Sequence, residues 1–273
     1  RSTGGEYYQS RWVRMNNLTI ATPQTWQAGE QVTVADGTDS LPMMLSAVGD
    51  FNSYSPPVGA FDVVALFDQE PRPLNIAASR MDHYRLWVKR MEHILPPGTP
   101  FLVTAVSRMT HGSAGAFDID VSMPGVMETR QAGPSLLVVR FDRPVTGFGG
   151  LDASDVTVSS GSVTGLAVND GELSVTLSGV ANAANLTISF PGIISVANGA
   201  AATQSLCFGV LRGDVTGDRQ VSSLDLIGVR ARLGRPVTAA NFRYDVRADG
   251  AIGSLDLIVV RTNLGRTLST ACP

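Results

Sequence analysis

The sequence predicts a mainly β chain with a short helical module at its C-terminus, and three observations carry this prediction. Short runs of alternating apolar and polar residues, separated by Gly, Pro, Asn and Asp, recur through the first 200 residues. Pro96-Pro97-Gly98 breaks this series into two parts. The residues after 206 differ in kind, because they contain an internal repeat with an offset of 31 residues. We therefore expect modules at 1–97, 98–206 and 207–273.

The composition restricts the class of protein. Apolar residues make up 44% of the 273 residues, which suffices for packed cores and excludes a wholly disordered chain. The net charge of −3 leaves no basic footprint, so we expect no nucleic-acid partner. The longest apolar runs have the length of strands, so we expect no membrane span. Arg1 stands where an initiator Met would, which indicates a processed chain without its targeting segment.

Alternating runs predict two successive β modules. In the first part, the runs at 12–20, 31–35 and 61–67 are typical of strands. Residues 83–94 fit a strand or a helix, and their β-branched and aromatic content favours a strand. The second part has the spacing of an immunoglobulin-like β-sandwich, although the Cys…Trp…Cys signature of antibody domains is absent. Its runs are 136–141, 155–158, 163–168, 173–177 and 186–190.

Two cysteines, Cys207 and Cys272, bracket the C-terminal repeat. A disulfide between them would close a long loop and restrict the unfolded chain by about 4 kcal/mol. Such a bridge would also indicate an oxidising, extracytoplasmic compartment. Two unrelated buried thiols are the alternative, and the position of the cysteines favours the disulfide.

The repeat consists of two copies of a loop followed by a helix. Residues 213–234 and 244–265 are identical at 12 of 22 aligned positions. In the first copy Ser223 or its neighbour can cap the helix, and Gly234 ends it. Each helix is expected to carry an apolar face, formed by Leu224, Ile227 and Leu233 in the first copy and by Leu255, Ile258 and Leu264 in the second.

All six acidic residues of the repeat are aspartates, and they fall at positions 1, 5 and 12 of each loop. Ca²⁺ takes six to eight oxygen ligands, so a loop that wraps the ion needs carboxylates at such intervals. Position 7 supplies a backbone carbonyl, and position 9 often acts through water. The alternative is an accidental acidic repeat on a solvated face. The predicted ligands are Asp214, Thr216, Asp218, Gln220, Ser222 and Asp225 in the first loop and Asp245, Asp249, Ala251 and Asp256 in the second.

This pattern resembles the type I dockerin family, which has two F-hand calcium loops, each followed by one helix. The family signature is close to D-x-N-x-D-x-x-x-x-x-x-D, and Asp225 and Asp256 match its Asp at position 12. The resemblance implies that calcium orders the segment and that the helices dock on a cohesin module. Two symmetric pairs of arginines are candidate docking contacts, Arg230 with Arg261 and Arg235 with Arg266.

The two loops depart from the signature at position 3, where the family prefers Asn or Asp. The first loop has Thr216, whose hydroxyl is a weak ligand, and Arg219 in place of Gly at position 6. The second loop has Arg247 at position 3, which cannot ligate and brings a positive charge beside the ion. We therefore expect one or two calcium ions, with the first loop as the better site.

The rest of the chain has looser resemblances. The string AVSRMTHGSAGAFDIDV at 105–121 resembles a motif that introduces an immunoglobulin-like module in extracellular modular proteins of environmental bacteria. The opening stretch, including VTVADGTDSLPMML and FDVVALFDQ, is similar to OB-fold-like domains of such surface proteins. These resemblances imply a barrel, a sandwich and a secreted or cell-surface location, and they imply no reaction.

Motifs of catalysis are missing from the sequence. It has no G-x-S-x-G, H-E-x-x-H or P-loop pattern, and no G-x-G-x-x-G after a strand. His111 and Ser113 could be combined with Asp118 or Asp120 into a Ser/His/Asp set, but no oxyanion element accompanies them. We therefore expect a protein that is not an enzyme.

An OB-like barrel can bind oligonucleotides or sugars on a strand face. Such a face could combine arginines and a lysine with tryptophans, and outside the cell this would favour carbohydrate over nucleic acid. The alternative is core tryptophans decorated by cations. The residues concerned are Arg11, Arg14, Arg85, Lys89 and Arg90 with Trp12 and Trp87.

These observations together predict a non-catalytic secreted or cell-surface protein with a calcium-stabilised docking tail. The tail would bind a cohesin-like module or other copies of the chain, and self-docking would give a fibre, sheath or matrix. One alternative is a polysaccharide-binding protein that the tail anchors. Another is a fragment of a larger enzyme whose catalytic domain precedes Arg1.

Overall fold

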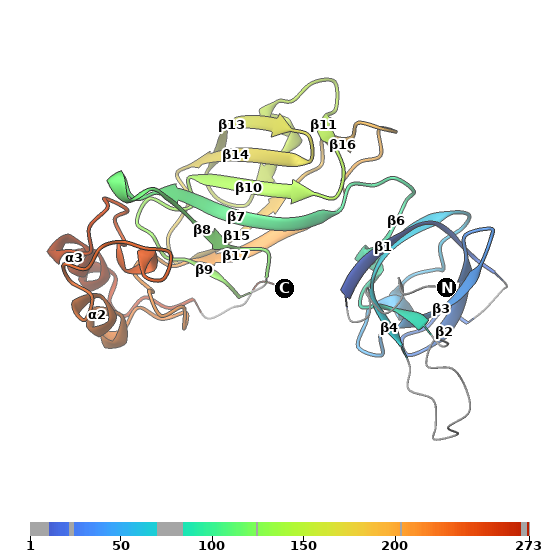
Figure 1. Ribbon diagram of the computed structural model, residues 1–273, viewed down its shortest axis with the longest axis horizontal. Helices are drawn as coiled ribbons and strands as arrows, with labels where there is room; N and C mark the ends of the chain where they lie inside the picture. Colours follow the sequence, from blue (N-terminus) through green and yellow to red (C-terminus); the bar gives the residue numbers. More distant parts are fainter. Residues whose placement is uncertain are drawn as a thin grey trace, which may run out of the picture. The chain divides into compact units, whose positions relative to one another are not determined.

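The computed structural model describes residues 11–21, 25–69, 84–123, 125–202, 204–268 and 272. The chain divides into two units, Arg1–Thr99 and Pro100–Pro273. The first unit is a β-barrel, and the second combines a β-sandwich with the helical tail (Figure 1). Within the described residues, no helix has the length and apolar character needed to cross a bilayer.

Five strands of the first unit close into a barrel in the order β1-β2-β3-β5-β4, with β4 returning to β1. β3 and β5 run parallel, and the other pairs run antiparallel. This is the OB-like barrel that the resemblance implied. The strands are β1 (Arg11–Ile20), β2 (Gln31–Ala35), β3 (Ser40–Leu45), β4 (Phe61–Gln69) and β5 (Tyr84–Val88), with a short β6 (Ile94–Leu95) added to β4.

The apolar side chains of the alternating runs fill the interior of the barrel. Val32 and Val34 of β2 and Met43 and Leu45 of β3 have no exposed surface, because every second side chain of a strand points to the same face. Residues 83–94 do not form one strand. Within them, β5 is followed by a 3₁₀ turn at Met91–His93 before β6, and position 83 lies outside the described residues.

A buried carboxylate ties the barrel together. Asp62 of β4, which is 1% exposed, accepts hydrogen bonds from Arg14 Nη2 (2.5 Å) and from the backbone N–H groups of Asn17 and Gly98 (2.8 Å each). Asn17 lies at a β-bulge of β1 with a φ of 55°. Burial opposes the ionisation of Asp62, but Arg14 and the two N–H groups outweigh burial and lower the pKa of this carboxyl.

The second unit contains a sandwich of two antiparallel layers. One layer has the order β13-β14-β10-β7-β8 and the other the order β12-β15-β17-β9, in which β9 runs parallel to β17. A two-stranded ribbon, β11 (Val145–Gly147) with β16 (Ile193–Ser195), completes it. The first layer comprises β7 (Leu102–Thr110), β8 (Ala116–Asp120), β10 (Leu136–Phe141), β13 (Ser162–Asn169) and β14 (Glu172–Ser178), and the second β9 (Met127–Glu128), β12 (Thr157–Val158), β15 (Ala184–Ser189) and β17 (Ser205–Val210).

Side chains from both layers form one apolar core. Val139 of β10 and Val175 of β14 pack in the same cluster as Ile188 of β15 and Phe208 of β17, and none of the four is exposed. Two facing sheets with such a shared interior are the expected sandwich architecture.

The tail contains the two expected helices, α2 (Ser223–Arg230) and α3 (Ser254–Asn263). The predicted disulfide is present between Cys207 of β17 and Cys272, with a Cα–Cα distance of 5.7 Å. It fastens the end of the repeat to the strand that precedes the repeat. A separate small core, rich in valine and including Val221, Val229 and Val260, holds the loops and helices together.

Asp62→Asn is expected to destabilise the barrel by about 3 kcal/mol, because it leaves Arg14 without its buried ionic partner. All three tryptophans lie in the first unit, so urea unfolding followed by tryptophan fluorescence reports the barrel. The matched control is Asp39→Asn on an exposed turn.

The contribution of Asp62 should also depend on pH. Since its folded pKa lies below the ordinary 3.8, the stabilisation is present above pH 3.8 and is lost as pH falls through the folded pKa. If Asp62→Asn unfolded at pH 7 with the same urea midpoint as Asp39→Asn, the role given to Asp62 would be contradicted.

Candidate calcium loops and docking face

The first loop turns around the carboxylate of Asp214, whose side chain is fully buried. Its Oδ1 accepts hydrogen bonds from the backbone N–H groups of Gly217 (2.7 Å) and Asp218 (3.1 Å). Its Oδ2 accepts one from the N–H of Arg219 (2.9 Å). Arg219 has a φ of 73°, so it adopts at position 6 the left-handed conformation that Gly adopts most easily.

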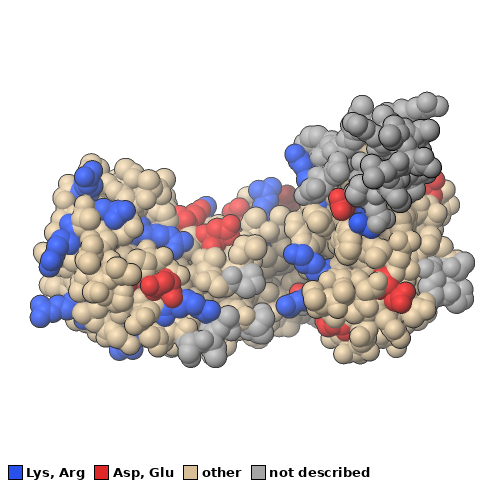
Figure 2. Space-filling model, turned by 90° about the horizontal axis from the view of Figure 1, so that it is seen from below, with Lys and Arg blue, Asp and Glu red and all other residues tan. Residues whose placement is uncertain are grey.

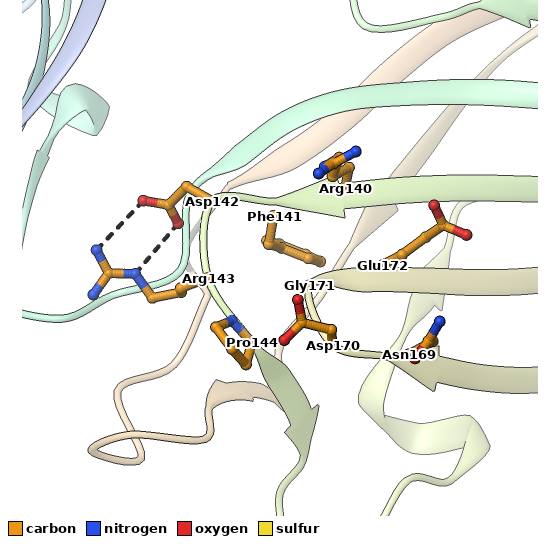
Figure 3. A pocket seen from close by; sticks show the side chains of 9 residues that line it. All are labelled: Arg140, Phe141, Asp142, Arg143, Pro144, Asn169, Asp170, Gly171 and Glu172. Atoms are coloured by element: carbon orange, nitrogen blue, oxygen red, sulfur yellow. Dashed lines mark hydrogen bonds and ion pairs between the residues drawn. The ribbon is translucent and has the colours of Figure 1, made fainter.

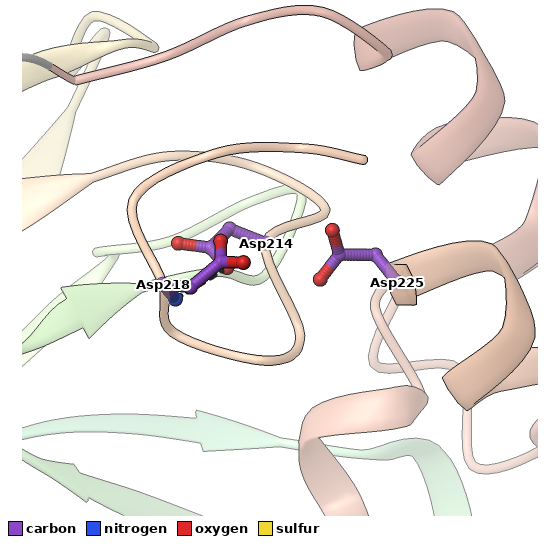
Figure 4. Close-up of side chains that lie close together, drawn as sticks. All are labelled: Asp214, Asp218 and Asp225. Carbon is purple, nitrogen blue, oxygen red and sulfur yellow. Dashed lines mark hydrogen bonds between the residues drawn. The ribbon is translucent and has the colours of Figure 1, made fainter. Parts of the chain in front are cut away.

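Asp225 closes this loop from the first turn of α2 (Figure 4). Its Oδ1 accepts from the backbone N–H (3.0 Å) and the hydroxyl (2.9 Å) of Thr216, and its Oδ2 accepts from the N–H of Ser222 (2.7 Å). The ligand atoms of Asp214, Asp218 and Asp225 all lie within 4.8 Å of one another. Three carboxylates and a hydroxyl gathered in this way fit a hard cation such as Ca²⁺.

The second loop repeats this backbone pattern. Asp245 Oδ1 accepts from the N–H of Asp249 (3.2 Å), and its Oδ2 accepts from the N–H of Gly250 (2.9 Å). Asp256, at the start of α3, accepts from the N–H groups of Arg247 (3.0 Å) and Gly253 (2.8 Å). Both loops therefore place buried aspartates at positions 1 and 12.

The loops differ at position 3. The Arg247 guanidinium lies 3.6 Å from Asp249 Oδ2, so the second loop has a cation beside its position-5 carboxylate where the first has the Thr216 hydroxyl. In the described part of the chain, one group of three acidic side chains is close enough to share a metal ion, and it belongs to the first loop. At position 7, Gln220 and Ala251 each donate their N–H to the position-5 carboxylate of their own loop.

Burial makes these carboxylates harder to ionise. It raises the pKa of Asp214, the charges of Asp225 and Asp218 raise it further, and the N–H groups of the loop oppose the shift. Burial likewise raises the pKa of Asp256, with added repulsion from Asp245 and Asp249. Each loop thus concentrates negative charge that a cation would neutralise.

The apolar faces of the two helices are exposed. Leu224 (59%) and Ile227 (60%) on α2 match Leu255 (47%) and Ile258 (54%) on α3. Leu233 and Leu264, which follow at the helix ends, are also exposed. The buried residues are instead Val229, Val259 and Val260. We call the six exposed leucines and isoleucines the docking face.

The C-terminal segment is also rich in exposed basic side chains. Residues 207–273 contain nine arginines and six aspartates, and four of these aspartates are fully buried. The four arginines proposed as docking contacts, Arg230, Arg235, Arg261 and Arg266, are all exposed. Figure 2 shows basic side chains gathered over the end that carries the helical tail.

The sequence did not indicate how the tail is seated on the sandwich. His111, in the turn between β7 and β8, lies with its Nδ1 2.9 Å from Asp245 Oδ2, and both side chains are fully buried. Asp118 instead forms an ion pair with Arg108 (2.7 Å). His111 is therefore bonded to an aspartate of the tail and Asp118 to an arginine, rather than to each other.

Two hollows lie elsewhere. One at the end of the sandwich has a volume of about 300 Å³, and its lining contains no serine, cysteine or histidine (Figure 3). The other, on the barrel, has a volume of about 500 Å³ and is lined by Trp12, Val13, Arg14, Met15 and Phe67. Trp12 is 50% exposed, and the Lys89 ammonium lies 5.3 Å from its ring centroid.

A loop-helix repeat with aspartates at positions 1, 5 and 12 defines a module of the EF-hand type. Comparison with known families agrees, since residues 212–265 match the model of the dockerin type I domain. No curated protein matches the chain. The C-terminal segment is therefore a dockerin module, which belongs to a calcium-binding, non-catalytic class that docks on cohesin modules and is typically found outside the cell.

Proposed function

We propose that the protein is a secreted, non-catalytic docking protein, in which the dockerin module attaches the barrel and sandwich to a partner. The observation that carries this proposal is the docking face, an apolar surface repeated on two helices and left exposed. Large exposed apolar patches on a folded protein mark interaction sites. The surrounding arginines favour a partner whose contact surface is apolar at its centre and acidic at its rim.

Calcium would set the shape of this module. We propose Asp214, Thr216, Asp218 and Asp225 as side-chain ligands in the first loop, with the Gln220 carbonyl at position 7 and Ser222 at position 9. In the second loop, Asp245, Asp249 and Asp256 with the Ala251 carbonyl would form a weaker site. Because the carboxylates repel one another without a cation, calcium binding would contribute directly to the folding of the tail.

Asp225→Ala is expected to cause a larger loss of calcium affinity than Asp256→Ala, because the first loop has no arginine among its ligands. Isothermal titration of chelator-treated full-length protein with CaCl₂ measures both variants, with Asp39→Ala as the control. We expect a loss of at least about tenfold for the first loop. Equal losses would contradict the ranking of the loops.

The partner is a cohesin-like module or a second copy of this chain. Both options use the same face, and a contact between the tail of one copy and the β modules of the next would give an open fibre, because such a contact does not close. Size-exclusion chromatography with light scattering, run with calcium and then with chelator, distinguishes a calcium-dependent multimer from a monomer.

A double variant, Ile227→Asp with Ile258→Asp, is expected to abolish docking. Each change places a charge at the centre of an apolar contact, where a single residue can contribute about 2 kcal/mol. Binding to an immobilised type I cohesin module and self-association by light scattering are the measurements. Val58→Asp is the matched control, since Val58 is 99% exposed on the barrel. A double variant that docks like the wild type would overturn the role of this face.

The hollow on the barrel supports a second candidate function, polysaccharide binding. An exposed tryptophan beside the hollow offers a ring on which a sugar can stack, and Lys89 provides a polar contact at its edge. Trp12→Ala should then abolish retardation of the protein in affinity electrophoresis on polysaccharide gels, while calcium-dependent docking is unchanged. Wild-type protein that migrates unretarded on every gel would remove this candidate.

A further inference from the structure

The turn between β7 and β8 of the sandwich reaches into the second calcium loop of the dockerin module. The Gly112 N–H donates to the carbonyl of Ala248 (3.1 Å), one residue after His111 contacts Asp245. A Cβ at Gly112 would lie 2.2 Å from the carbonyl oxygen of Asp249. The two backbones therefore pack so closely that only glycine fits at this position.

His111 donates to the second loop a hydrogen bond that comes from outside that loop. The first loop, in contrast, surrounds its position-1 carboxylate with donors of its own. Among the residues that the structure describes, the donors to the Asp214 carboxylate all lie at positions 3 to 6 of the same loop. Asp245, at the equivalent position, accepts from its own loop and also from the imidazole of a residue 134 positions earlier. The repeat is symmetric in sequence, whereas its support by the sandwich is not.

The imidazole is held rigidly. The rings of Phe117 and Phe242 meet it edge-on at centroid distances of 5.3 and 5.7 Å and stack on each other at 5.2 Å. Its Nε2 is buried and has no hydrogen-bond partner among the described residues. Since an ionised carboxylate only accepts, Nδ1–H is the donor of the hydrogen bond to Asp245. This one hydrogen bond is what the buried imidazole provides.

We propose that His111 is a positioning residue for the second calcium site, supplied by the sandwich. This inference rests on the calcium loops of the proposed function. Asp245 Oδ2 accepts from both His111 and Gly250, whereas Oδ1 accepts from the Asp249 N–H alone, so Oδ1 is the oxygen with a lone pair left for the ion. Outer hydrogen bonds of this kind fix the orientation of a ligand, and their loss typically lowers metal affinity about 10- to 100-fold. The sandwich and the dockerin module thus form one calcium-binding unit.

The test uses the full chain with the first loop disabled by Asp214→Asn and Asp225→Asn, so that calorimetric titration with CaCl₂ reports the second loop. Adding His111→Ala should weaken that site about tenfold. Ser113→Ala, which changes an exposed side chain in the same turn, is the matched control and should alter affinity less than twofold. Circular dichroism confirms that the sandwich remains folded in each variant.

A second readout needs no metal. In calcium-free protein with both loops intact, His111→Ala should speed hydrogen exchange in 245–256 and leave exchange in 214–225 unchanged. Gly112→Ala keeps the imidazole but forces the turn off the Asp249 carbonyl, so it should give the same pattern. This variant replaces His111→Ala if the latter fails to fold.

Three results would overturn the inference. The first is a second loop that binds no calcium in the Asp225→Asn variant, in which the second loop and His111 are unchanged. The second is an unchanged affinity in His111→Ala, and the third is uniform exchange across both loops. If calcium binds the first loop but the affinity of the second loop does not depend on His111, only this inference fails. If neither loop binds calcium, the calcium-dependent docking of the proposed function fails as well.

Discussion

The tail is organised by buried carboxylates. Asp214, Asp225, Asp245 and Asp256 have no exposed surface, and such groups are tolerated only when donors or cations surround them. Each draws backbone N–H groups of its own loop around its oxygens, which forces the chain to turn. The aspartates at position 12 also accept from the N-cap N–H groups of α2 and α3. The buried aspartates at positions 1 and 12 therefore determine both the shape of each loop and the residue at which its helix begins.

One short segment of the sandwich, 128–131, contacts both halves of the repeat. The carbonyls of Glu128 and Thr129 accept from Leu211 and Gly213, which lead into the first loop, and the N–H of Gln131 donates to Val246 in the second. Behind this segment, the buried Arg130 guanidinium pairs with Glu128 (2.7 Å). Breaking such a pair would leave an uncompensated buried charge. The ion pair therefore fixes the geometry of the segment on which the tail packs.

The sequence predicted what depends on short-range pattern. Alternation gave the strands that form the barrel and sandwich, and repeated aspartate spacing gave the dockerin module. It did not show which helix face is buried, because Leu226 and Val229 are as apolar as Leu224 and Ile227, and tertiary packing decides between them. It also could not show the contact of His111 with Asp245, since nothing local marks two polar residues 134 positions apart as neighbours.

The exposed side of the dockerin module and the side that packs on the sandwich differ in symmetry. On the exposed side, Leu224 and Ile227 repeat as Leu255 and Ile258, so a partner that contacts this side meets two nearly equivalent surfaces. On the sandwich side the repeat is broken, because His111 contacts Asp245 of the second loop, whereas Asp214 accepts hydrogen bonds from its own loop alone within the described parts of the chain. Under our two proposals, calcium occupancy would be controlled from the asymmetric side, while partner recognition would depend on the symmetric one.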